Sequence, residues 1–76
     1  MLTKKYLVSN KPHTVMNGRH LLYTLPNGIT LSAINGSKFH FYKYAWEIWA
    51  SVDDDPIVFS TEKEANAYIF KLAKRK

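Results

Sequence analysis

The stretch that decides the fold is Leu21–Ala33, LLYTLPNGITLSA. Two runs of alternating residues flank Pro26-Asn27-Gly28, where proline presets φ and the Asn-Gly pair accepts a positive φ. This pattern predicts a β-hairpin. Because successive side chains of a strand point to opposite faces, we expect one apolar face and one polar face. The apolar face would hold Leu21, Tyr23, Leu25, Ile29, Leu31 and Ala33, and the polar face Thr24, Thr30 and Ser32.

A longer strand is predicted downstream, from about Phe39 to Val52, after a turn at Asn35-Gly36-Ser37. Its even positions form an apolar row that is expected to face the core. The run Asp53 to Pro56 ends this strand, and Ile57-Val58-Phe59 then reads as a brief edge strand, because Pro56 cannot donate to a ladder. The expected core row is Tyr42, Tyr44, Trp46, Ile48, Ala50 and Val52.

A helix is predicted after this edge strand. Thr61-Glu62-Lys63-Glu64 has the spacing of a capping box, in which the Thr61 hydroxyl accepts from the Glu64 amide and the Glu64 carboxylate reaches back to Thr61. An apolar stripe follows at i, i+3, i+4 and i+7. The stripe is Ala65, Tyr68, Ile69 and Leu72, and it is expected to cover Tyr23, Leu31, Tyr44, Trp46 and Ile48.

Upstream of the hairpin, Tyr6-Leu7-Val8 is a candidate first strand, and Ser9 to Asn17 is expected to be a loop containing Pro12. A sheet covered on one face by the helix is the simplest packing for this order of elements. We expect an α+β fold, with an antiparallel sheet of three to five strands and one C-terminal helix packed across one face. Residues 1–76 are expected to form a single domain.

Composition gives information on the cellular compartment and the charge distribution of the protein. The chain has no cysteine, which favours a reducing compartment and a cytoplasmic location. Neither a signal-peptide core nor an apolar run long enough to span a membrane is found. The net charge of +5 is polarised. Positions 1–46 hold six bases and no acid, positions 47–64 hold all six acids, and the tail is basic again.

Motifs that carry catalytic or metal chemistry are not recognisable. His13, His20 and His40 lack a helical i, i+4 spacing and a neighbouring cysteine or aspartate. Three consecutive carboxylates at Asp53 to Asp55 fit a solvated turn better than a cation loop. The serines lack the Gly-x-Ser-x-Gly context. We therefore expect a protein that is not an enzyme and that has no cofactor and no metal.

Two candidate binding surfaces remain. Phe39, Phe41 and Trp49 lie on the odd face of the long strand, opposite the core row. If they are exposed, they predict a protein-binding surface, and the alternative is that the N-terminal segment or the second turn covers them. The second candidate is a nucleic-acid surface, because the element order resembles the arm-binding domains of phage integrases. It would use Lys4, Lys5, Lys71, Lys74, Arg75 and Lys76 on phosphates, although the polar sheet face, with Thr24, Thr30, Ser32, Lys43 and Glu47, has only one base and one acid.

Taken whole, the sequence resembles small, mostly uncharacterised accessory proteins of tailed bacteriophages. The resemblance rests on Asn27 to Ser32 leading to Gly36, on Trp46-Glu47-Ile48, and on Phe59 to Ala65 opening a final helix. It implies a protein that binds and blocks a host protein or complex in the host cytoplasm, as an inhibitor or modulator. A homodimer through the edge of the long strand is left open.

Overall fold

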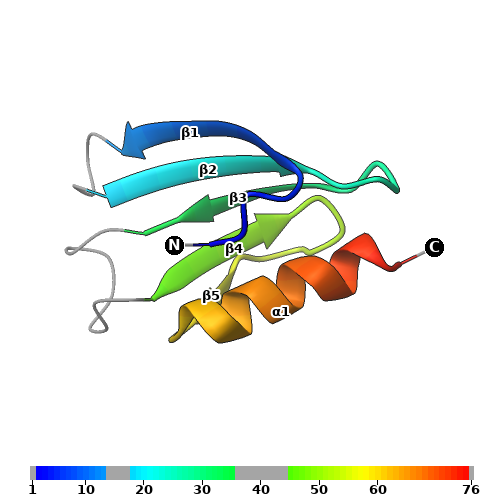
Figure 1. Ribbon diagram of the computed structural model, residues 1–76. Helices are drawn as coiled ribbons and strands as arrows, with labels where there is room; N and C mark the ends of the chain where they lie inside the picture. The colour runs from blue at the N-terminus through cyan, green and yellow to red at the C-terminus, as the bar shows by residue number, and fades with distance from the viewer. Residues whose placement is uncertain (1, 14–17, 36–44, 76) are drawn as a thin grey trace.

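The computed structural model describes residues 2–13, 18–35 and 45–75. These residues form one five-stranded antiparallel sheet, in which the strands follow the chain order, and one helix (Figure 1). The predicted α+β class, with a C-terminal helix against an antiparallel sheet, is confirmed. The elements are β1 (Leu7–His13), β2 (Gly18–Thr24), β3 (Thr30–Ile34), β4 (Trp46–Ala50), β5 (Ile57–Phe59) and α1 (Glu62–Ala73).

The predicted hairpin is formed by β2 and β3. Their register pairs Leu21 with Ala33 and Tyr23 with Leu31. In the turn, the Gly28 amide donates to the Leu25 carbonyl at 3.0 Å, and Gly28 takes a positive φ of 86°. The expected apolar face is confirmed, because its members are buried except for half-buried Ile29.

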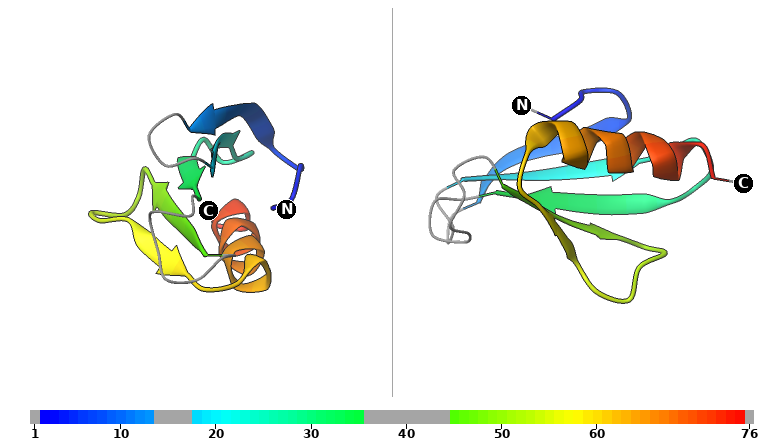
Figure 2. Two further views of the ribbon diagram at one scale, coloured as in Figure 1. Left: turned by 90° about the vertical axis from the view of Figure 1, so that its left-hand side faces the viewer. Right: turned by 90° about the horizontal axis from the view of Figure 1, so that it is seen from below.

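One face of the sheet, the inner face, is covered by α1 and by the N-terminal segment, residues 2–6 (Figure 2). The predicted stripe buries Ala65, Ile69 and Leu72, and Tyr68 is half-buried. The role of the N-terminal segment was not predicted. Leu2 is only 2% exposed and belongs to the core cluster, which also contains Trp46, Ile48 and the inner-face residues of the hairpin.

Hydrogen bonds tie the N-terminal segment to both layers of the fold. The Thr3 amide donates to the side-chain oxygen of Asn66 on α1 at 2.8 Å. The Thr3 carbonyl accepts from the hydroxyl of Tyr23 on β2 at 2.7 Å. The segment therefore bridges the helix and the sheet on the inner side of the molecule.

The ends of α1 are satisfied by side chains. The Thr61 hydroxyl accepts from the Glu64 amide at 3.2 Å, as the capping box predicts, and it donates to the Glu64 carboxylate at 3.2 Å. At the other end, the side-chain amide of Asn27 donates to the carbonyls of Leu72 and Arg75. The hairpin turn thus caps the helix C-terminus.

The prediction of a loop from Ser9 to Asn17 was wrong for its first half. Strand β1 continues through Ser9 to His13 and pairs with β2 over this length. Pro12 is compatible with a strand there because β1 is an edge strand, where a missing amide need not cost a ladder hydrogen bond. The register shifts between Leu7 and Ser9, which places a bulge at Val8.

The long strand is shorter at its end than predicted. β4 ends at Ala50 because the Asp53 amide donates to the Ala50 carbonyl at 3.0 Å and turns the chain. Val52 is therefore 43% exposed and not a core residue, whereas Trp46, Ile48 and Ala50 are buried as predicted. Tyr42 and Tyr44 lie outside the described residues.

The predicted brief edge strand, β5, is confirmed. It pairs with Trp46, Glu47 and Ile48 of β4 at the end of the strand order, so this part of the long strand has a partner on both sides. A homodimer through the edge of the long strand stays a prediction. In the part of the chain that the structure describes, no helix has the length and apolarity to cross a membrane.

Candidate functional site

The outer face of the sheet, opposite α1, carries a group of exposed apolar side chains. The strand register aligns Ser9, Leu22, Ser32 and Trp49 in one row across β1 to β4. Leu22 is 41% exposed and Trp49 52% exposed, and Val8 on the β1 bulge is 67% exposed. We call this surface the open face and define it by Val8, Leu22, Thr24, Thr30, Ser32 and Trp49.

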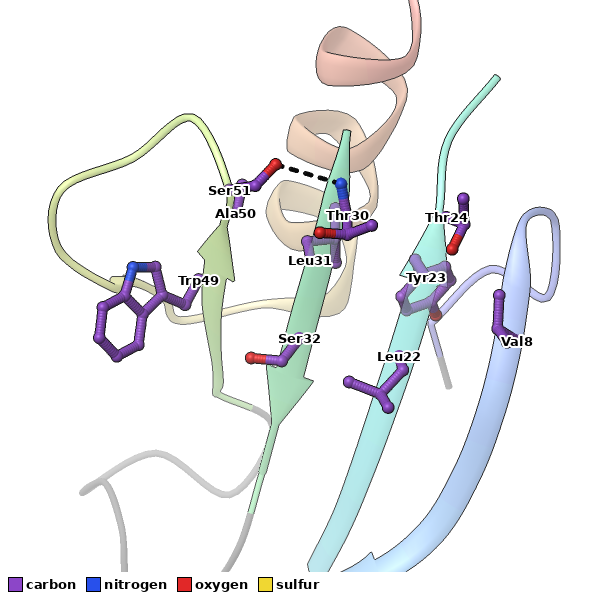
Figure 3. Close-up of a pocket in the computed structure, with 10 residues that line it drawn as sticks. All are labelled: Val8, Leu22, Tyr23, Thr24, Thr30, Leu31, Ser32, Trp49, Ala50 and Ser51. Carbon is purple, nitrogen blue, oxygen red and sulfur yellow. Dashed lines mark hydrogen bonds between the residues drawn. The ribbon is translucent and has the colours of Figure 1, made fainter. Parts of the chain in front are cut away.

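A shallow hollow of about 470 Å³ runs over the open face (Figure 3). Its floor is the short hydroxyl side chains of Thr30 and Ser32 on the central strand β3. Leu22 and Val8 rise on one side of this floor, and Trp49 stands on the other. The shape follows from residue size, because small side chains on one strand between large ones on its neighbours leave a groove.

The hollow is uncharged. None of the described residues that line it is an aspartate, glutamate, lysine, arginine or histidine, although the chain as a whole has eleven bases and six acids. The adjacent row along the register, Lys11, His20, Ile34, Glu47 and Val58, brings one lysine and one glutamate to the outer face. Polar contacts in the hollow are therefore left to hydroxyl groups.

Trp49 is anchored by its own chain. The indole Nε1 donates to the backbone carbonyl of Asp53, in the turn after β4, at 3.2 Å. Next to it, the Ser51 amide donates to the Thr30 carbonyl at 2.8 Å, and the Thr30 amide donates to the Ser51 hydroxyl at 3.2 Å. Since the indole N–H is already bonded, the exposed part of the ring is a carbon surface for apolar contact.

The predicted protein-binding set is described in part. Trp49 lies on the face opposite the core and is exposed, as the alternation predicts. The N-terminal segment does not cover it, because this segment lies on the inner face with α1. Phe39 and Phe41 lie outside the described residues.

Two residues of the open face were missed. Leu22 lies between inward-facing Leu21 and Tyr23, so the hairpin alternation alone places it on the outer face beside Thr24. That signal was present in the sequence. Val8 was missed because its exposure depends on the bulge in β1, and no local sequence pattern marks that bulge.

The segments that hold the described phosphate-binding candidates lie at one end of the sheet, which also carries acids. The segment with Lys4 and Lys5 meets the sheet at the end of β2, where the Thr24 amide donates to the Tyr6 carbonyl (Figure 1). The C-terminal end of α1, with the exposed Lys71, Lys74 and Arg75, contacts the hairpin turn at the same end. The turn that holds Asp53, Asp54 and Asp55 is also at this end. Lys76 lies outside the described residues. Bases at a helix C-terminus favour the helix dipole, which accounts for part of this cluster without a ligand.

Groups of three or more metal-ligating side chains do not occur within the described residues. Among the described residues, Tyr23 and Tyr68 have raised pKa values. Burial raises the pKa of Tyr23 to about 12. Burial, together with the hydrogen bond to Asp53, raises the pKa of Tyr68 to about 12. Both phenols are therefore proton donors and not nucleophiles near neutral pH.

No known protein family, curated protein or solved structure matches this chain.

Proposed function

We propose that this protein is a non-catalytic module that binds another protein through its open face. The observation that carries the proposal is Trp49, which is 52% exposed on the helix-free side of the sheet while its indole N–H is bonded within the chain. Tryptophan is enriched among the residues that dominate binding energy at protein interfaces. Exposed apolar side chains that lie together mark such interfaces.

The surroundings of Trp49 support a protein partner. Leu22 and Val8 extend the apolar surface across the hollow, and Thr24, Thr30 and Ser32 offer hydroxyl donors and acceptors between them. An apolar centre with polar groups that can pair is the usual composition of an interface. The partner should contribute an uncharged, apolar segment, because the residues known to line the hollow carry no charge in the described part of the chain.

The nucleic-acid alternative has less support from the charge arrangement. Phosphate binding requires a positively charged surface. The affinity falls steeply with salt concentration, because salt ions screen the attraction between the bases and the phosphates. Here the segment with Lys4 and Lys5 and the end of α1 with Lys71, Lys74 and Arg75 share one end of the sheet with the turn that holds Asp53, Asp54 and Asp55. The open face itself has no base to contact phosphate or a base edge.

The resemblance to accessory proteins of tailed bacteriophages supports a more specific form of the proposal. In this form the partner is a host protein or complex, and occupancy of the open face inhibits or modulates it. An intact core and one exposed apolar face are sufficient for that role, since blocking a partner requires affinity and no bond making.

Affinity capture from a bacterial lysate tests the proposal. Three tagged forms are compared: the parent, Trp49→Ala, and Phe70→Ala as the matched control. Phe70 is also an exposed aromatic residue, 37% exposed, but it lies on α1 on the other side of the sheet. Circular dichroism spectra establish that each variant keeps the parent fold.

We expect one stoichiometric protein with the parent and with Phe70→Ala, and its loss with Trp49→Ala. Retention of that protein by Trp49→Ala would contradict the proposal, as would the capture of no protein. Nuclease-sensitive captured material that elutes with moderate salt would favour the nucleic-acid alternative. Substrate turnover by the purified chain would contradict the non-catalytic part.

A further inference from the structure

We propose that Tyr68, acting through Asp53, is a positioning residue that holds Trp49 in place on the open face. Asp53 contacts both sides of the sheet. Its backbone carbonyl accepts from the Trp49 indole at 3.2 Å, and its carboxylate accepts from the Tyr68 hydroxyl at 2.5 Å. One residue therefore connects the helix that covers the inner face with the exposed tryptophan of the outer face.

Asp53 is fixed more firmly than a surface turn requires. Its amide also donates to the Ala50 carbonyl at 3.0 Å, so its amide, carbonyl and carboxylate groups are all bonded. Asp53 is half-buried, whereas the following Asp54 and Asp55 are exposed. The three acids of the turn thus have different roles, and only the first reaches toward the fold.

Packing places the Tyr68 hydroxyl toward Asp53. It lies on α1, is half-buried, and its ring packs against Phe59 of β5 with 5.1 Å between ring centroids. A hydrogen bond to a carboxylate is stronger than one between neutral groups. The raised pKa of Tyr68, about 12, extends the pH range over which the phenol stays protonated and can donate to Asp53.

A fixed Trp49 should bind more tightly than a mobile one. Ordering a side chain during association lowers affinity, and a side chain that is already ordered avoids most of that loss. This consequence rests on the proposed function. Removing the Tyr68 hydroxyl should therefore weaken partner binding about three- to tenfold, with the contact surface unchanged.

The positioning role is measured on the free protein, without a partner. The chain has two tryptophans, Trp46 at 2% exposure and Trp49 at 52%, so 5-fluorotryptophan labelling should give two resolved ¹⁹F signals. The Trp49 signal is assigned by its loss in Trp49→Phe. Tyr68→Phe keeps the ring and removes the hydroxyl, and Asp53→Ala removes the carboxylate. Asp54→Ala is the matched control, since it removes the same charge from an exposed neighbour.

We expect the Trp49 signal to narrow and shift toward that of free 5-fluorotryptophan in Tyr68→Phe and Asp53→Ala, with the Trp46 signal unmoved. Asp54→Ala should match the parent. An unchanged Trp49 signal in both variants would overturn the positioning role, whether or not a partner binds. If the signal moves and no protein is captured by any form, the positioning role stands and the proposed function fails.

Discussion

Asn27, in the turn between β2 and β3, donates a hydrogen bond of 2.8 Å from its side-chain amide to the carbonyl of Leu72, near the end of α1. The same amide donates to the Arg75 carbonyl at 2.6 Å, and the Asn27 side-chain oxygen accepts from the Ile29 amide at 3.2 Å. The last carbonyls of a helix lack the usual intrahelical partner, and this side chain donates to one of them, at Leu72, and to the carbonyl of Arg75 just beyond the helix. Sheet and helix are thereby joined at one end.

The first prediction concerns this contact. Asn27→Ala should lower the free energy of unfolding by about 1–2 kcal/mol, because two hydrogen bonds are lost, one to the last turn of α1 and one to the residue that follows its C-cap. Asn27→Asp keeps the turn-forming oxygen but cannot donate, so it should be destabilised to a similar degree. Urea unfolding of both variants measures the effect. Parent-like stability of Asn27→Asp would show that the amide does not stabilise the helix end.

The second prediction concerns the buried stripe of α1. Ile69 and Leu72 are 0% and 3% exposed, so Ile69→Ala or Leu72→Ala should cost about 2–5 kcal/mol. Thr61→Ala removes only the N-cap and should cost about 1 kcal/mol. Thermal melts of the three variants give the order. If the two core variants melt like the parent while Thr61→Ala does not, the helix does not pack as described.

The third prediction compares two glycines. A Cβ atom at Gly18 would overlap the backbone carbonyl of Asn35, whereas a Cβ at Gly28 would meet nothing within 4 Å. Gly28 instead has a positive φ of 86°, which costs an alanine about 1 kcal/mol. Gly18→Ala should therefore destabilise the fold more than Gly28→Ala, since backbone must move to admit the methyl group. Chemical denaturation ranks the two variants, and the reverse order would contradict the close approach at Asn35.

The fourth prediction concerns alkaline pH. Burial raises the pKa of Tyr23 from 10.0 to about 12, so the folded state holds the phenol proton more tightly than the unfolded state does. This contribution to stability is fully present below about pH 10, and it is lost as the pH rises toward about 12. Unfolding free energies measured across this window should fall with pH. Tyr23→Phe, which cannot ionise, should show a shallower fall, and an equal fall would contradict the assignment.

Local sequence patterns predict the elements of the fold well where the apolar residues of the pattern are the ones that become buried. The alternation around Pro26-Asn27-Gly28 places the hairpin and its inner face, and the capping box at Thr61 places the helix start. The extent of β1 could not be predicted, because Pro12 normally indicates a loop and only its edge position makes it compatible with a strand. The contribution of Leu2 to the core depends on a tertiary crossing that no local pattern marks.

The candidate site is predictable only in part. Alternation along β4 identifies Trp49 as outward-facing, and the same rule identifies Leu22 on β2. The link from Asp53 to Tyr68 joins residues fifteen positions apart in different elements, so it requires the fold itself. The charge pattern predicts the site least well, because the segment before β1, the end of α1 and the turn after β4 are distant in sequence but lie at one end of the sheet.

The most direct test of the central claim is the dissociation constant of the captured protein for three forms of the chain, measured at the same salt concentration. A tryptophan at the centre of an interface typically contributes about 2 kcal/mol or more, which corresponds to about thirtyfold in affinity. We expect Trp49→Ala to bind about thirtyfold or more weakly than the parent, and Phe70→Ala to bind like the parent. Equal affinity of Trp49→Ala and the parent would show that the open face is not the binding surface.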